Sequence, residues 1–236
     1  GRYVAGAAAL ALLAGIGSGA ALWLLWPAVS LLLVAACYLG FGARGFQMDA
    51  QGRMAWAARA LLAPYRMGAR VNGWWWTRGL PATREVLPGV ALGSVARLGA
   101  PPMQGPSGRF TLVSLCAELQ GPALHPCLCQ PWLDLVPASA KDLKRAAATI
   151  ERAVQAGGPV VVGCALGFSR SVAAMACWLT RSGRMGDLDA ALQHLRRAHP
   201  QLVLGDDWRR ALQQATQWRR RRNRRRPTTL WPAPPS

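Results

Sequence analysis

Acidic residues are scarce in this chain, and one long stretch has no charge at all. The 236 residues include 10 Asp and Glu against 28 Lys and Arg, so the formal net charge at pH 7 is +18. No charged residue stands between Arg2 and Arg44. The three histidines are scattered, and no second Cys or His pair stands at zinc-ligand spacing from Cys127 and Cys129. The sequence therefore predicts no metal and no cofactor.

The uncharged N-terminal stretch is too long for a single membrane pass. One helix through all of it would measure ~58 Å, about twice the ~30 Å hydrocarbon core of a bilayer. Trp23, Trp26 and Pro27 suit a turn at the membrane interface, where aromatic side chains are enriched. We therefore expect a transmembrane helical hairpin, with passes near residues 3–22 and 27–42. One long pass with an interfacial remainder is the alternative.

The segment after the hairpin, residues 45–82, is rich in arginine. The positive-inside rule places this segment in the cytoplasm, and Arg2 at the other end agrees with a hairpin whose two ends lie on the same side. Aromatic and aliphatic side chains stand between the arginines, and Trp74-Trp75-Trp76 follows them. We expect a basic amphipathic helix and an aromatic belt that lie on an anionic bilayer surface. A solvated basic linker is the alternative.

The C-terminal residues 219–236 hold a run of arginines followed by a Pro-rich end, and we expect a disordered tail there. Runs of like charge are usually solvated. Such a run could bind nucleic acid by counterion release, but no base-reading fold accompanies it. Anionic lipid is therefore the first partner we expect for the tail, solvent alone the second and nucleic acid the last.

Residues 83–218 are predicted to form one α/β domain, preceded by the α-helical transmembrane segment of residues 1–44. Strand-forming and helical patterns follow one another along this domain. The expected strands cover residues 85–94, 109–115 and 160–163, and the expected helices run from Ser139 or Asp142 to about 156 and then over about 170–181, 186–198 and 206–218. This order predicts a small sheet flanked by helices.

The loop between the last strand and the helix after it reads Cys-Ala-Leu-Gly-Phe-Ser-Arg-Ser, residues 164–171. A loop that leads into a helix N-terminus points backbone N–H groups into a concavity at the positive end of the helix dipole, so an anion belongs there. The same field favours the thiolate form of a cysteine. Arg170 would supply a planar fork for two phosphate oxygens. One loop thus holds a nucleophile, Cys164, together with an oxyanion cradle and a cationic clamp.

This pattern resembles the Cys-x5-Arg-Ser/Thr signature of the cysteine-dependent protein tyrosine phosphatases, and most of all their dual-specificity branch in a bacterial, membrane-anchored form. Cys164, Gly167, Arg170 and Ser171 fall on the pattern, whereas Gly163 stands where the family usually has His. The resemblance implies hydrolysis of phosphate monoesters through a phosphocysteine, with the Ser171 hydroxyl stabilising the departing thiolate. It also implies that phosphate is bound by Ala165, Leu166, Gly167, Phe168, Ser169 and Arg170.

A leaving alkoxide or phenoxide needs a proton, and the family places the acid that donates it about thirty residues before the cysteine. Asp134 stands thirty residues before Cys164, in a loop bounded by two prolines. Asp142 is the rival, but capping of a helix explains it better. A third possibility is that this segment holds no catalytic acid. Glu118 is expected either to hold the loop or Arg170, or to lie on the surface.

The sequence therefore predicts a phosphatase anchored in a membrane, with its catalytic domain in the cytoplasm. Its arginine-rich, lysine-poor composition is associated with a bacterium, and hence with an inner membrane. The substrate is left open between a phosphoprotein and a phospholipid, although a highly phosphorylated inositol is disfavoured because Arg170 is the only basic residue of the loop. Two other classes stay open. One is a phospho-binding or scaffolding module that has lost activity, for which Gly163 is the best support, and the other is a rhodanese-like sulfur transferase.

Overall fold

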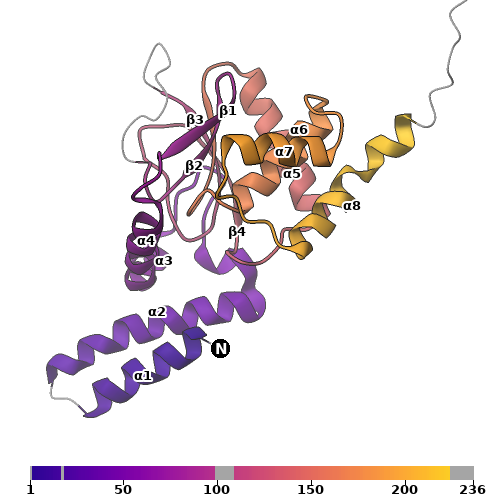
Figure 1. Ribbon diagram of the computed structural model, residues 1–236. Helices are drawn as coiled ribbons and strands as arrows, with labels where there is room; N and C mark the ends of the chain where they lie inside the picture. Colours follow the sequence, from indigo (N-terminus) through magenta and orange to yellow (C-terminus); the bar gives the residue numbers. More distant parts are fainter. Residues whose placement is uncertain (1, 17–18, 99–108, 224–236) are drawn as a thin grey trace, which may run out of the picture.

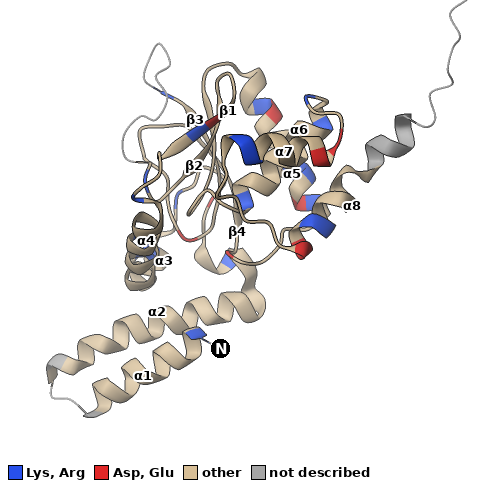
Figure 2. Cartoon of the chain, in the orientation of Figure 1, with Lys and Arg blue, Asp and Glu red and all other residues tan. Residues whose placement is uncertain are grey.

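The computed structural model describes residues 2–16, 19–98 and 109–223, and Figure 1 shows how they are arranged. Two apolar helices lie side by side at the N-terminus, and an α/β unit follows them. The N-terminal elements are α1 (Arg2–Ile16), η1 (Gly19–Leu24), α2 (Leu25–Ala36), η2 (Cys37–Phe41) and η3 (Gly42–Phe46). Figure 2 shows that Arg2 is the one charged residue on α1 and α2.

The hairpin turns earlier than the sequence analysis expects. Trp23, Trp26 and Pro27 lie within helical structure, in η1 and α2, and α1 packs beside both of these elements. Proline at the start of a helix is compatible with this, because the first N–H groups of a helix have no partner within it. The helical run Ala21–Phe46 has 26 residues and contains an 18-residue window with a mean hydropathy of 2.1, so it could cross a membrane by length and composition. The apolar α1 has 15 residues and is ~22 Å long, shorter than one pass needs.

The segment after the hairpin packs against its neighbours on both sides. It forms α3 (Trp56–Leu61) and α4 (Ala63–Thr77). The indole Nε1 of Trp26 in α2 donates to the carbonyl of Ala60 at 3.2 Å, and the Tyr65 N–H donates to the hydroxyl of Ser30 at 3.3 Å. On its other side, α4 packs Ala69 against buried side chains of the α/β unit. Residues 56–77 therefore join the hairpin to the α/β unit, which neither a free linker nor a helix resting on the bilayer alone would do.

The α/β unit contains a five-stranded sheet in the order β1-β2-β5-β3-β4. Its strands are β1 (Thr83–Leu87), β2 (Val90–Ser94), β3 (Thr111–Cys116), β4 (Cys127–Trp132) and β5 (Val160–Cys164). The β1–β2 pair is antiparallel and the other pairs are parallel. The central strand β5 is buried along its whole length, as parallel strands covered on both faces usually are. The predicted fold class, a small sheet flanked by helices after an apolar helical segment, is confirmed.

Helices cover both faces of the sheet. The helices of the C-terminal half are α5 (Ala140–Gln155), α6 (Arg170–Ser182), α7 (Leu188–Ala198) and α8 (Asp206–Asn223). They bury one large core against the sheet, which includes Val162, Leu143, Trp178 and Leu212. A smaller core on the other face includes Leu112 and Val161, and α4 contributes to it. The carboxyl end of β5 and the amino end of α6 meet between these two cores.

Candidate active site

The predicted phosphate loop connects β5 directly to α6. The Cys164 side chain is buried, and its Sγ accepts a hydrogen bond from the Gly167 N–H at 3.2 Å. The Ser171 hydroxyl, in the first turn of α6, lies 3.4 Å from the same Sγ. Gly167 has a φ of +84°, a conformation that favours glycine. A Cβ there would also lie only 3.0 Å from the Gly93 carbonyl oxygen, so both the backbone conformation and the available space require glycine. The loop thus surrounds the sulfur with the backbone N–H and hydroxyl that the sequence predicts.

Gly163 is explained by the close packing of side chains around the central strand β5. A Cβ at this position would lie 3.1 Å from Val95 Cγ2 and 3.2 Å from Leu112 Cδ1, so a histidine would force both side chains to move. Other groups hold the start of the loop here. The Ser94 hydroxyl donates to the Ala165 carbonyl at 2.8 Å, and the Val95 N–H donates to the Cys164 carbonyl at 2.9 Å.

The far side of the loop rests on a histidine that the sequence analysis treated as scattered. The His199 side chain is buried at the end of α7, and its ring lies edge-on to Phe168 with 5.4 Å between centroids. Burial, and the charge of Arg84, lower the pKa of His199, so the ring is neutral at pH 7. The Val203 N–H also donates to the Phe168 carbonyl at 2.9 Å. Nothing in the sequence pattern around His199 indicated this contact.

Arg170 points into the protein and binds a buried carboxylate. Its Nη1 and Nη2 donate to the two oxygens of Glu118 at 2.9 and 2.6 Å, and Nη1 also donates to the Trp132 carbonyl at 2.8 Å. Asp134 Oδ1 lies 3.2 Å from Nη2. Of the two roles expected for Glu118, the structure supports the one at Arg170. The Arg170 Nε is buried and has no hydrogen-bond partner among the described residues.

The charges of this pair support each other. Burial alone would raise the pKa of Glu118, but the Arg170 guanidinium offsets this by its charge and hydrogen bonds, and the pKa lies below its ordinary value. Burial would likewise lower the pKa of Arg170, but the Glu118 carboxylate raises it well above its usual range. Both groups are therefore charged at neutral pH, and the guanidinium is fixed in one orientation.

Two further thiols, those of Cys116 and Cys177, are fully buried. All six cysteines are free. Burial raises the pKa of Cys116 and, in α6, raises the pKa of Cys177 to about 12. These thiols are protonated at pH 7 and are poor nucleophiles. No group of three or more His, Cys, Asp and Glu among the described residues could hold a metal ion.

Asp134 reaches the site from the loop after β4. Its side chain is 37% exposed, and it lines a cavity of about 390 Å³ together with Cys164 and Arg170. The next residue, Leu135, has a φ of 60°, a strained conformation for a residue with a Cβ that clusters at functional sites. Asp142 instead lies in the first turn of α5, where Ser139 caps the helix by accepting from its N–H at 3.1 Å. The structure thus brings Asp134 to the phosphate loop and places Asp142 in the first turn of α5, where its Oδ2 accepts from the hydroxyl of the capping residue Ser139 at 2.6 Å.

Four hydrogen bonds to this site come from three residues of the N-terminal segment and were not predicted. The Tyr38 hydroxyl donates to the Asp134 carbonyl at 3.1 Å. Arg66 donates to the Glu118 carbonyl at 3.3 Å and to Gln120 Oε1 at 2.9 Å, and Arg70 donates to the Gln120 carbonyl at 3.3 Å. These two arginines, expected to face lipid, bind the loop that carries Glu118. Arg66 and Arg70 are four residues apart and therefore lie on one face of the helix, which is the one feature of the sequence that could have indicated a shared binding partner.

Comparison with known proteins agrees with this geometry. Residues 128–218 match the sequence profile of the dual specificity phosphatase catalytic domain. A variant of human DUSP28 shares 26% identity over 61% of this chain and 99% of that chain, with a TM-score of 0.51. The fold is of the dual specificity phosphatase type.

A second solved structure of this type is similar to the same extent. A mouse dual specificity phosphatase complexed with zinc tungstate shares 26% identity over 61% of this chain and 92% of that chain, with a TM-score of 0.51. A comparison with curated proteins finds no match to the sequence. The two structures each cover 61% of this chain, and the residues that match the family profile, 128–218, lie within the α/β unit.

Proposed function

We propose that this chain is a membrane-anchored phosphatase that hydrolyses phosphate monoesters through a phosphocysteine on Cys164. The observation that carries the proposal is the joint placement of Cys164 Sγ at the N-terminus of α6 and of a charged, buried Arg170 with an unpartnered Nε. A thiolate, a ring of amides and a fixed guanidinium are the groups that transfer of a phosphoryl group to sulfur needs.

Phosphate would bind against the amides of residues 165–170 and the free edge of Arg170. Glu118 occupies the Nη1–Nη2 edge of the guanidinium, so the edge formed by Nε and Nη2 is the one that can donate to two phosphate oxygens. The mouse structure contains tungstate, a tetrahedral oxyanion like phosphate, which supports an oxyanion site in this fold. Binding of phosphate would weaken the contact between Asp134 and Nη2, which frees the carboxyl for catalysis.

The reaction would proceed in two balanced steps. The Cys164 thiolate attacks phosphorus, the bond from phosphorus to the ester oxygen breaks, and that oxygen takes the proton of the Asp134 carboxyl. Water then attacks the phosphocysteine and gives a proton to the Asp134 carboxylate, and the sulfur leaves as a thiolate that the Ser171 hydroxyl stabilises. The net products are an alcohol and inorganic phosphate, and both protein groups return to their starting states.

The N-terminal segment supports membrane anchoring. Its apolar helical run Ala21–Phe46 is long enough to cross a bilayer, and α1 lies beside it without a charge after Arg2. In our proposal the hairpin anchors the chain with both of its ends in the cytoplasm of a bacterium, at the inner membrane. The arginines that follow the hairpin support this orientation.

Turnover of a generic aryl phosphate by the full chain in detergent micelles tests the proposal. Cys164→Ser should lower turnover by at least about four orders of magnitude, because the oxygen nucleophile is far less reactive, and should preserve binding of inorganic vanadate or phosphate. Cys127→Ser, at a half-buried thiol of β4, is the matched control and should keep full activity.

The same experiment separates the alternative functions. Phosphate binding by the wild-type chain without any turnover would indicate a phospho-binding module. Transfer of sulfur from thiosulfate to cyanide without phosphatase activity would indicate a sulfur transferase. Either result contradicts the proposed function.

A further inference from the structure

We propose that the substrate of the phosphate loop is a membrane lipid that ends in a phosphate monoester, and that the N-terminal hairpin forms part of its binding site. This inference rests on the proposed phosphatase function and adds the class of substrate and the residues that recognise it. It assigns to α1 and α2 a role in the active site beyond anchoring.

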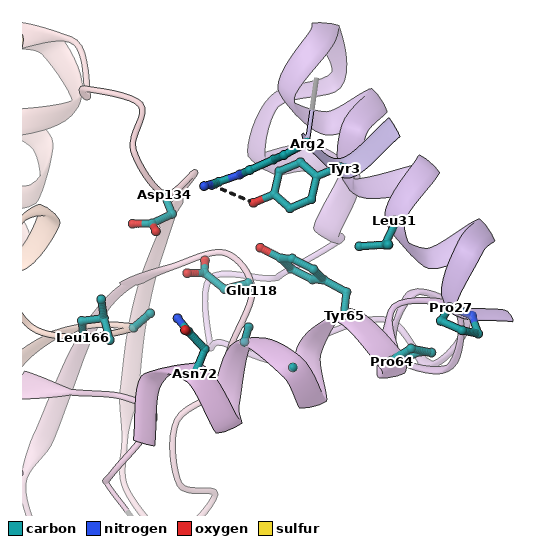
Figure 3. Close-up of a pocket in the computed structure, with 13 residues that line it drawn as sticks. Arg2, Tyr3, Pro27, Leu31, Pro64, Tyr65, Asn72, Glu118, Asp134 and Leu166 are labelled. Atoms are coloured by element: carbon teal, nitrogen blue, oxygen red, sulfur yellow. Dashed lines mark hydrogen bonds between the residues drawn. The ribbon is translucent and has the colours of Figure 1, made fainter. Parts of the chain in front are cut away.

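A cavity of about 410 Å³ lies between the hairpin and the phosphate loop. It falls in the ~300–1,000 Å³ range of small-molecule sites. Figure 3 shows that its two ends differ: Pro27, Leu31 and Pro64 line one end, and Glu118, Asp134 and Leu166 line the other. One end is thus apolar and built from the hairpin and α4, and the other carries the charged groups of the site.

This cavity adjoins the one that contains the nucleophile. Asp134 and Leu166 line both cavities, and Cys164 and Arg170 line the second. A phosphate ester bound at Cys164 therefore has its leaving oxygen near Asp134, and the remainder of the molecule can pass Leu166 toward the hairpin. An amphipathic molecule with its phosphate at one end matches this arrangement of polar and apolar walls.

Arg2 supplies a second cation between the two ends. Its guanidinium donates to the Tyr3 hydroxyl at 3.2 Å and, among the described residues, forms no salt bridge. Figure 3 shows Arg2, Tyr3 and Tyr65 between the apolar and the charged end of the cavity. Burial raises the pKa of Tyr65, so its hydroxyl is a neutral donor. Hydrogen-bond donors between the charged and the apolar end of the cavity could bind the ester oxygens that join a lipid headgroup to its acyl chains.

The surroundings of the cavity favour a lipid over a phosphopeptide. The face of the hairpin that the protein leaves uncovered is apolar, with Leu12, Leu32 and Leu33 exposed. Trp74, Trp75 and Trp76 are exposed on α4, as expected of side chains at a bilayer interface. A peptide would bring backbone N–H and C=O groups to an end of the cavity lined by two prolines and a leucine, where they would lose their hydrogen bonds to water.

The hairpin also contacts the catalytic acid loop. The Tyr38 hydroxyl donates to the Asp134 carbonyl, so the position of the acid depends on the segment that would hold the acyl chains.

Cleavage of the lipid follows the reaction above: the bond between phosphorus and the glycerol oxygen breaks, and that oxygen takes the Asp134 proton. The products are a neutral lipid alcohol and inorganic phosphate after hydrolysis of the phosphocysteine.

The test compares phosphatidic acid with glycerol 3-phosphate, which lacks the acyl chains that the hairpin would touch, and with phosphate esters of other classes. The full chain in mixed micelles is assayed with phosphatidic acid, glycerol 3-phosphate, phosphotyrosine and phosphoserine peptides, and an aryl phosphate. We expect kcat/KM for phosphatidic acid to exceed that for glycerol 3-phosphate at least about 100-fold, the effect of burying about four methylene groups. A higher kcat/KM for a phosphopeptide than for phosphatidic acid would overturn the lipid assignment, and so would equal values for phosphatidic acid and glycerol 3-phosphate. Either result would still leave a working phosphatase. No turnover of any substrate, the aryl phosphate included, would instead overturn the proposed function and this inference with it.

A pair of arginine variants separates a lipid site from simple attachment to the micelle. Arg2→Gln should raise KM for phosphatidic acid about tenfold, because one charge-assisted hydrogen bond is lost, and should lower the ratio of lipid to aryl phosphate turnover. Arg2→Lys should recover part of the loss. Arg44→Gln removes the same charge at the other end of the uncharged stretch, at an exposed residue outside the cavity, and should change neither value. Equal effects of Arg2→Gln and Arg44→Gln would show that Arg2 contributes only to attachment, and would overturn its role in the site.

Discussion

The phosphate loop and the acid loop are held in place in different ways. The phosphate loop depends on the chain next to it: β5 delivers Cys164, Gly167 turns the backbone, and α6 begins at Arg170. The acid loop depends on distant segments, because the Asp134 carbonyl is bound by Tyr38, 96 residues before it. The groups that bind phosphate therefore come from one stretch of the chain, which Ser94, Val95 and Val203 hold from within the α/β unit, whereas the acid is positioned by the N-terminal segment.

Arg170 links the two regions. It belongs to the phosphate loop, but Glu118 fixes its guanidinium, and Arg66 from α4 binds the carbonyl of Glu118. A change in α4 can therefore reach the phosphate site through two side chains. The following changes separate the local contribution from the distant one, in order of decreasing expected effect.

Asp134→Asn should have the largest effect on the acid step. Turnover of an alkyl phosphate, whose leaving group needs a proton, should fall about 10²–10³-fold, and turnover of an activated aryl phosphate should fall far less. Rates on the two substrates measure this. Asp142→Asn, which makes the same change at the helix cap of α5, is the control and should leave both rates unchanged. Equal losses on both substrates would place the acid elsewhere.

Arg170→Lys should lower turnover of every substrate by about 10²-fold, because an ammonium group cannot donate from two parallel positions as the guanidinium does. Steady-state rates on the aryl and alkyl phosphates provide the measurement, with Arg184→Lys on the surface of the same unit as control. A lysine variant with nearly full activity would mean that Arg170 serves only to bind Glu118.

Glu118→Gln should affect stability as well as rate. Breaking a buried ion pair costs about 3–5 kcal/mol, because Arg170 keeps its charge without a full partner. The pKa of Glu118 is lower in the folded chain than in the unfolded one, so its contribution is present above the ordinary value of ~4.3 and is lost as the pH falls through the lower folded value. Unfolding by urea should therefore show a large difference between wild type and variant at pH 7, and a smaller one below about pH 4. A difference that does not change with pH would contradict the ion pair.

Tyr38→Phe should have the smallest effect. It removes one hydrogen bond to the Asp134 carbonyl, about 0.5–1.5 kcal/mol, so turnover of an alkyl phosphate should fall about two- to tenfold. Turnover of an activated aryl phosphate should change less, because that leaving group does not need the acid. Trp23→Phe, at an exposed aromatic residue of the hairpin, is the control. An equal loss on both substrates would show that Tyr38 acts on the whole site and not through the acid loop.

The sequence predicts the local structure around the phosphate loop well, whereas residues 85–94, expected as one strand, form parts of the antiparallel pair β1 and β2. The strand, loop and helix around residues 160–182 were placed correctly because an apolar run, a glycine and a helical pattern follow one another there. The cap of α5 at Ser139 was among the expected starts for the same reason. The strand β4 was missed because Pro131 argues against a strand. It is tolerated since β4 lies at the edge of the sheet, where no further strand requires its N–H.

The distant contacts could not be predicted from the sequence. Composition indicated an apolar and then a basic N-terminal segment, but not that Tyr38 and Arg66 would turn toward Asp134 and Glu118. The hairpin turn was placed wrongly because tryptophans occur within helices as well as at turns on a membrane interface, and the Trp26 indole in α2 donates to the Ala60 carbonyl of the next segment. Such choices depend on tertiary packing, which residue patterns do not contain.

Trapping the covalent intermediate tests the central claim most directly. The full chain is mixed with an activated aryl phosphate and quenched within milliseconds, and its peptides are examined by mass spectrometry. We expect one phosphoryl group on the peptide that contains Cys164, none in Cys164→Ser, and a longer-lived intermediate in Asp134→Asn, which lacks the base for the second step. Full turnover with no phosphoryl group on Cys164, or with the group on another residue, would contradict this claim.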